Sequence, residues 1–146
     1  MHTSFPPPET LLPHAPPMVL LDSITECSDE HILCQAQSHL SPDNPLRVEG
    51  ELSVYAAVEY AAQAMAAHAR LTGNQSSGPR KGVIAVASKL CAETLRLDDL
   101  PGVLIIRADI LARNADSSLC AFTVSANEQQ LLLSGQLTAV TREPDA

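Results

Sequence analysis

Hydrophobic and polar residues alternate along two parts of the chain, on either side of an alanine-rich central segment. The alternating runs lie at 18–25, 31–38, 83–97, 104–112, 120–125 and 131–141. In one of them, Leu104 and Ile106 share a face while Arg107 lies on the other. This period is typical of β-strands with one buried face. We therefore expect two strands before the central segment and three or four after it, with 83–97 as one long strand or two joined by a bend.

The central segment, from Ser53 to about Leu71, predicts one long helix. Alanine, the best helix former, dominates it. Ser53 is a suitable N-cap and Gly73 a suitable stop. Apolar residues lie on nearly every face, which is typical of a buried helix. A sheet can bury one helix in this way only by curling around it. The predicted fold is therefore α+β, an antiparallel sheet wrapped around one long central helix, with an edge strand that a second subunit commonly covers.

The length of 146 residues indicates a single domain. Residues 1–17 hold six of the eleven prolines and predict an extended lead-in. We expect the folded domain at 18–142 and a polar tail at 143–146.

Charge and aromatic content argue against nucleic-acid binding. Seventeen acidic residues against nine basic ones give a net charge of −8, and phosphate contacts need concentrated Lys and Arg. Aromatic residues make up 3% of the chain, too few for a base-stacking surface.

Cysteine use and the N-terminal residues predict a cytoplasmic protein. The four cysteines form no C-x-x-C pair, so we expect reduced, buried hydrophobic side chains rather than metal ligands. Residues 1–10 are polar and proline-rich, unlike a signal peptide. No apolar run reaches the length of about 18 residues that a membrane span needs.

Glu59 is the most informative residue because it lies in the middle of the apolar helix. Helical geometry places Gln63 and Arg70 within about 40° of it, so the three form one polar stripe. A carboxylate there must be hydrogen-bonded, ion-paired or kept neutral. A structural ion pair, an exposed stripe and a tuned general acid/base all remain open.

The histidines differ in what they indicate. His68 is about half a turn out of phase with Glu59, so we expect it to be structurally satisfied or exposed. Exposure accounts for His31 and His39, at a turn and a strand end. His14 lies in a loop bracketed by prolines, where loop packing and a site are equally good interpretations.

Two motifs resemble those of hot-dog-fold 3-hydroxyacyl-[acyl carrier protein] dehydratases. L-L-P-H-A-P-P-M-V-L-L-D-S-I at 11–24 resembles the opening L-P-H-R-x-P-x-L-L-x-D-R-V. A-V-E-Y-A-A-Q-A at 57–64 resembles the helix motif L-x-E-A-M-A-Q-A, with Glu59 and Gln63 at its Glu and Gln. Lys89 and Pro101-Gly102 match the later part of the pattern. The chain looks most similar to the aryl-polyene-type branch, and the resemblance covers nearly the whole sequence.

The resemblance implies a hot-dog dimer with an acyl-phosphopantetheine tunnel along the subunit interface, and no metal or redox cofactor. It implies dehydration of 3-hydroxyacyl thioesters, linked to acyl carrier protein or CoA, to trans-2-enoyl thioesters in fatty-acid or polyene synthesis. Glu59 would then be catalytic and Gln63 would orient it. Backbone N–H groups around Ser53 and Val54 would bind the substrate by stabilising the enolate oxygen.

One departure concerns the catalytic histidine. The family carries G-H-F-P before the helix, and its histidine works with the helix Glu of the other subunit. Here that place falls near Pro45, in D-N-P-L, and holds no histidine. His14 is our candidate for the second catalytic residue, with His39 as another possibility.

Basic residues gather between 70 and 96, where Glu93 is the only acid. This cluster is interpreted either as a solvated face or as a docking patch for an acidic carrier protein or a pantetheine phosphate. The residues assigned to carrier docking are Arg70, Arg80, Lys81 and Lys89.

Two alternative functions remain open on the same fold. A thioester hydrolase needs one helix carboxylate and no histidine, which suits the missing motif. A non-catalytic subunit would instead complete a heterodimer with a true dehydratase. In each case we expect at least a dimer. It is either a homodimer or a heterodimer with a related hot-dog subunit, and a higher oligomer stays open.

Overall fold

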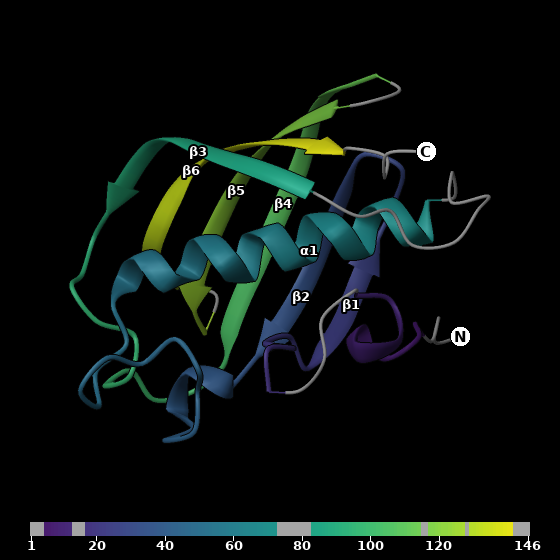
Figure 1. The fold of residues 1–146 in the computed structure, drawn as a ribbon. Coiled ribbons are helices and arrows are strands. Elements are labelled where there is room, and N and C mark those ends of the chain that lie inside the picture. Colours follow the sequence, from purple (N-terminus) through teal and green to yellow (C-terminus); the bar gives the residue numbers. More distant parts are fainter. Residues whose placement is uncertain (1–4, 13–16, 73–82, 115–116, 128, 142–146) are drawn as a thin grey trace, which may run out of the picture.

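Six antiparallel strands curl around one helix in the computed structural model, as Figure 1 shows. The structure describes residues 5–12, 17–72, 83–114, 117–127 and 129–141. The strands are β1 (Ser23–Cys27), β2 (His31–Ala36), β3 (Val83–Ala92), β4 (Leu104–Arg113), β5 (Ser117–Ala126) and β6 (Gln130–Thr141), and the helix is α1 (Ala57–Leu71). Their order in the sheet is β1-β2-β4-β5-β6-β3. The predicted architecture is therefore confirmed.

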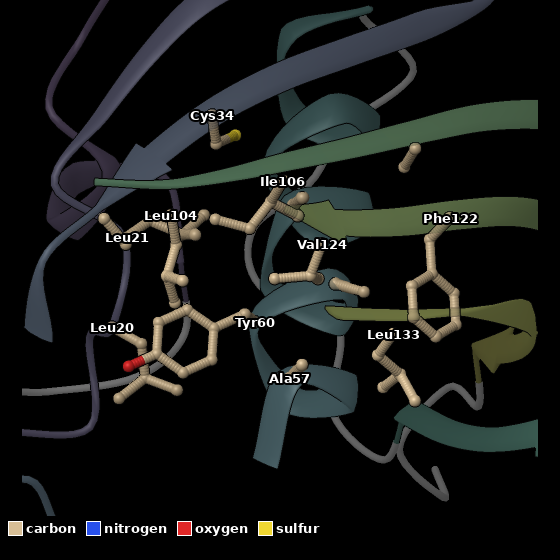
Figure 2. Close-up of a cluster of buried hydrophobic side chains, with 14 of the residues drawn as sticks. Leu20, Leu21, Cys34, Ala57, Tyr60, Leu104, Ile106, Phe122, Val124 and Leu133 are labelled. Carbon is tan, nitrogen blue, oxygen red and sulfur yellow. The ribbon is translucent and has the colours of Figure 1, made fainter. Parts of the chain in front are cut away.

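The register of the central strands places the buried side chains on the concave face. Ile106 of β4 lies opposite Cys34 of β2 and Val124 of β5, and all three are fully buried. The same alternation continues on β5 with Phe122, which lies with Leu133 of β6 in the hydrophobic cluster shown in Figure 2. Burial on one face in every second residue is what the sequence alternation predicted.

Small side chains let α1 lie deep inside the curved sheet. Ala57, Ala61, Ala64 and Ala67 have no exposed surface. The helix packs against β2, β4 and β5, the strands at the middle of the sheet. Alanine leaves room for the strands to approach the helix backbone, so the composition of this segment fixes its place in the core.

The start of the helix is held by a short pairing with the segment that follows β3. The Ser53 side chain caps a 3-10 turn, η3 (Val54–Ala56), by accepting the Tyr55 N–H at 3.1 Å. This turn leads directly into α1, so Ser53 is a cap as predicted, but one turn before the α-helix begins. Asp98 accepts the Leu52 N–H at 2.8 Å and pairs with Arg96. The Arg96 guanidinium and the Leu52 N–H hold the pKa of this carboxyl well below its usual range.

Two other turns of 3-10 helix, η1 (Pro8–Thr10) and η2 (Ser38–Leu40), flank the first strands. The described part of the lead-in is therefore not extended throughout, and Leu12 is buried against the core. Residues 18–21, where we expected strand character, form none. β3 ends at Ala92 after a bulge, at which Lys89 has a φ of 54°.

The cysteines are free, and two of them follow the prediction. Cys34 and Cys120 are buried, and burial raises their pKa values to about 12 and about 11. Cys91 is exposed on β3 and Cys27 is half-buried, so the expectation of four buried cysteines is wrong for these two. Residues 88–91 are all exposed around the bulge of β3, which is an edge strand, and Cys91 is one of them. No helix in the described part of the chain is long and apolar enough to span a membrane.

His68 in the last turns of α1 is 1% exposed. Its Nε2–H donates to the Ser28 carbonyl at 2.8 Å, and its Nδ1 accepts from Arg113 at 3.1 Å. Burial lowers the pKa of His68, and the Arg113 charge acts in the same direction. The imidazole is therefore neutral and ties the helix to the β1–β2 turn and to β4.

We predict that His68 makes the protein less stable as the pH falls below about 6.5, the ordinary histidine pKa. The unfolded chain binds this proton at a higher pH than the folded one, so the free energy of unfolding falls, by at most about 1.4 kcal/mol per pH unit for each such histidine. Urea unfolding between pH 7 and pH 5.5, at constant protein concentration, measures this slope. His68→Gln should be less stable at pH 7 but have a flatter slope, and an unchanged slope would contradict the assignment.

Candidate active site

Glu59 lies in the first turn of α1 and is half-buried. Its Oε2 is 3.4 Å from Nε2 of Gln63, one turn further along the helix. The carboxylate is thus neither in bulk water nor sealed in the core. This is a position in which a carboxyl group can exchange a proton with a bound molecule.

Gln63 is completely buried and its amide is fully used. Oε1 accepts the Leu20 N–H at 2.9 Å, while Nε2 donates to the Met18 carbonyl at 2.6 Å and to Glu59. Nε2 has two hydrogens, and these two acceptors account for both. The amide therefore cannot flip without breaking three hydrogen bonds, and it presents a fixed N–H to the carboxylate.

A second buried network lies on the adjoining face of the helix, around Tyr60, which Figure 2 shows beside Leu20 and Leu104. The Tyr60 hydroxyl is 2.7 Å from Ser38 Oγ and accepts from Asn44 Nδ2 at 3.2 Å. Ser38 Oγ donates to the Leu20 carbonyl at 2.7 Å, so the tyrosine hydrogen points to Ser38. Burial raises the pKa of Tyr60, which keeps this hydrogen in place.

Asn44 lies in the D-N-P-L segment, near Pro45, where the resemblance leads us to expect the family histidine, and it is 6% exposed. Besides the bond to Tyr60, its Nδ2 donates to the Ser38 carbonyl at 2.9 Å, and its Oδ1 accepts the Leu46 N–H at 2.8 Å. Both hydrogens of Nδ2 and one lone pair of Oδ1 are thus used within its own chain. Asn44 therefore anchors the loop before the helix.

Sequence reasoning missed both Tyr60 and Asn44 as parts of this network. The available signal was a tyrosine directly after Glu59 in an alanine-rich helix, because a buried tyrosine hydroxyl needs a partner. Nothing in the sequence indicated that its partners would come from residues 38 and 44.

His39 is fully buried, so the expectation that it is exposed is wrong. The η2 turn directs its Nε2–H to the Leu100 carbonyl at 2.9 Å. Its Nδ1 is buried and finds no hydrogen-bond partner among the described residues. Burial lowers the pKa of this imidazole. His39 thus joins two loops and does not face Glu59 as a second catalytic group.

The other described histidines, His31 and His68, are also hydrogen-bonded away from Glu59. His68 is structurally satisfied, as expected, and His31 is bonded to Glu26 and Ser28 at the β1–β2 turn. His14 lies outside the described residues. Its pairing with Glu59 stays a prediction.

The structure brings together only part of the predicted polar stripe of Glu59, Gln63 and Arg70. It also describes only part of the predicted basic patch. Gln63 faces residues 18–20, whereas Arg70 is exposed in the last turn of α1. Lys89 is exposed at the bulge of β3, and Arg80 and Lys81 lie outside the described residues. Arg96 is paired with Asp98 and lies 3.8 Å from Glu51, so it serves the start of the helix.

Two of the backbone donors before the helix, the N–H groups of Leu52 and Val54, already have acceptors. Val54 N–H donates to the Leu95 carbonyl at 3.0 Å, and Leu52 N–H donates to Asp98. The Ser53 hydroxyl is used in capping. The Val54 N–H thus already has an acceptor within its own chain, and the predicted role of this segment in stabilising an enolate oxygen stays a prediction.

Solved structures with the same architecture place the chain in the hot-dog class. A chain of the dehydratase heterocomplex ApeI:P from Xenorhabdus doucetiae has a TM-score of 0.83 and 22% identity, covering 95% of this chain and 93% of that one. S. sahachiroi AziG has a TM-score of 0.62 and 16% identity, covering 92% and 99%. A hypothetical thioesterase from Streptococcus pneumoniae, solved with coenzyme A, has a TM-score of 0.53 and 13% identity, covering 85% and 88%. At these identities the likeness shows the fold alone.

The family is shown by the sequence itself. The profile of the ApeP-like family, described as ApeP dehydratase, matches residues 6–146. The chain belongs to this family. No curated protein matches it.

We predict that Tyr60→Phe lowers the free energy of unfolding by about 1–3 kcal/mol, because it leaves buried polar groups of Ser38 and Asn44 short of a partner. Tyr55→Phe is the matched control, since Tyr55 is 55% exposed. Urea unfolding of the two variants measures the difference. Equal effects would show that the buried network contributes no stability.

Proposed function

We propose that the chain takes part in dehydrating 3-hydroxyacyl thioesters to trans-2-enoyl thioesters, with Glu59 as its catalytic carboxyl group. The observation that carries the proposal is the half-buried Glu59 side chain, held by the fixed amide of Gln63, in a member of a dehydratase family. Neither metal nor redox chemistry is part of the proposed reaction.

The elimination needs one proton removed from C2 and one delivered to the hydroxyl group at C3. The thioester carbonyl makes the C2 proton acidic, and a base takes it. Glu59, protonated, gives its proton to the departing hydroxyl, so that water leaves and the double bond forms. Gln63 positions the carboxyl group through the N–H that it directs at Oε2.

The second catalytic group comes either from His14 or from another subunit. Asn44 supports the second source, because the D-N-P-L segment, where the resemblance leads us to expect a histidine, holds none, and Asn44 in it is hydrogen-bonded within its own loop. His39 and His68 are buried and bonded elsewhere. We therefore propose, as the second candidate function, that the chain is one subunit of a heteromeric hot-dog dehydratase.

We further propose that the acyl group arrives on acyl carrier protein in fatty-acid or polyene synthesis, in the cytoplasm. Arg70 and Lys89 are exposed cations on the described surface and suit an acidic carrier. The proposed docking set also includes Arg80 and Lys81, which lie outside the described residues. The acyl chain length is left open.

We predict that Glu59→Gln lowers the rate of dehydration about 10²–10⁴-fold, because the amide cannot exchange the proton. Mass spectrometry of a 3-hydroxyacyl carrier protein follows the loss of water. Glu49→Gln, which changes an exposed loop glutamate, should keep the wild-type rate. Wild-type turnover by Glu59→Gln would refute the assignment, and thiol release without an enoyl product would favour a thioester hydrolase.

Subunit composition is tested by assaying the purified chain alone and with a co-expressed hot-dog dehydratase subunit. The heteromeric candidate predicts an inert single chain and an active mixture. Full activity of the chain alone would reject that candidate. In that case His14→Gln should lower the rate of dehydration.

A further inference from the structure

A serine, a histidine and a carboxylate form a continuous hydrogen-bonded chain at the turn between β1 and β2. Ser28 Oγ lies 2.8 Å from Nδ1 of His31. Nε2 of the same imidazole is bonded to Oε2 of Glu26. This is the order of groups that activates a serine hydroxyl for nucleophilic attack: nucleophile, base and a carboxylate that orients the base.

The surrounding bonds fix where the hydrogens lie. Ser28 Oγ accepts the N–H groups of Glu30 and His31, each at 3.2 Å. Its own hydrogen is therefore directed at Nδ1 of His31. The imidazole then carries its hydrogen on Nε2 and donates it to Glu26, as a base oriented by a carboxylate requires.

The backbone of Ser28 is held on both sides. Its N–H donates to the His31 carbonyl at 2.8 Å, which closes the turn. Its carbonyl accepts the Nε2–H of buried His68, which is in turn bonded to Arg113. Figure 1 shows this turn at the same end of the molecule as the C-terminal end of α1. The serine is therefore fixed to the helix and the sheet and is not free to rotate away with a mobile loop.

The group is accessible and separate from Glu59. Ser28 is exposed, and the side chains of His31 and Glu26 are 21% and 55% exposed. His68, which touches Ser28, lies nine residues beyond Glu59 in the sequence. That spacing is about 13 Å along the helix axis. The two groups are therefore well separated along the helix.

We propose that Ser28 is a second reactive centre, a nucleophilic serine that is acylated by esters with a good leaving group. Oγ attacks the acyl carbon while its proton passes to Nδ1 of His31. The ester C–O bond breaks, and the leaving alcohol takes the proton from the imidazole. Water then attacks the acyl-serine by the same route, which releases the acid and restores the hydroxyl group. Glu26 is a positioning residue for His31 and does not touch the substrate.

The geometry also limits the substrate class. The N–H groups of Glu30 and His31 point at Oγ itself and stabilise charge there, not on an acyl oxygen. Cleavage of an amide depends strongly on donors to that oxygen. The expected substrates are therefore activated esters, with amides resistant.

A fluorophosphonate probe tests the proposal, because Ser28 Oγ would displace fluoride and form a stable phosphonyl ester. The experiment uses the full chain with Cys91→Ser, which removes an exposed thiol. Intact mass and peptide mapping should find one adduct, on Ser28. His31→Gln should slow labelling about 100-fold, as expected when a general base is lost. Ser88→Ala, which removes an exposed serine of β3, should leave the rate unchanged.

Hydrolysis of p-nitrophenyl acetate supplies the second measurement. Acylation of Ser28 should release an initial burst of one p-nitrophenol per chain. Glu26→Gln should slow this hydrolysis while the circular dichroism spectrum stays native, and Glu26→Asp should restore part of the rate. An unlabelled Ser28 in the folded protein, or equal labelling rates with and without His31, would overturn the proposal. Glu59→Gln should label normally, so that failure of the dehydratase assignment and failure of this one are distinguishable.

Discussion

The buried amide of Gln63 is the constraint on which the described site depends. A primary amide buried beside an apolar helix needs hydrogen-bond partners for its oxygen and both hydrogens. Without them, the free-energy cost of its burial exceeds the stability that its packing contributes. It finds them in the backbone of residues 18–20 and in Glu59. One side chain thus joins the lead-in segment, the central helix and the carboxylate. The position of Glu59 follows from the need to satisfy a neighbour in the core.

The two polar networks of the helix meet at a single residue, Leu20. The N–H of Leu20 is bonded to Gln63, and its carbonyl is bonded to Ser38, which also contacts Tyr60. Leu20 itself is buried in the cluster of Figure 2, so these bonds lie in surroundings of low dielectric constant, where an unmade bond is expensive. The segment before β1, the loop before α1 and the helix are therefore positioned together. A change in any one of them is expected to disturb the geometry at Glu59.

The opposite end of the helix is held by a buried histidine, His68. There His68 is neutral because it is buried, and it links α1 to the β1–β2 turn and to Arg113. This link fixes the turn that carries Ser28 and His31. The helix therefore connects the site proposed at Glu59 with the turn in which Ser28 is proposed to react, through hydrogen bonds within one chain.

The sequence by itself determined the architecture and singled out Glu59 as a candidate. Alternation in the strands and the alanine-rich helix are local signals, and a carboxylate among alanines is visible without coordinates. The sequence did not determine the burial of His39, the commitment of Asn44 or the occupation of the Val54 N–H. Each of these depends on a partner far away in the chain: Leu100, Tyr60 and Leu95. Periodicity reports which face a residue occupies, but only tertiary contact decides which donor meets which acceptor, and so which groups remain free for chemistry.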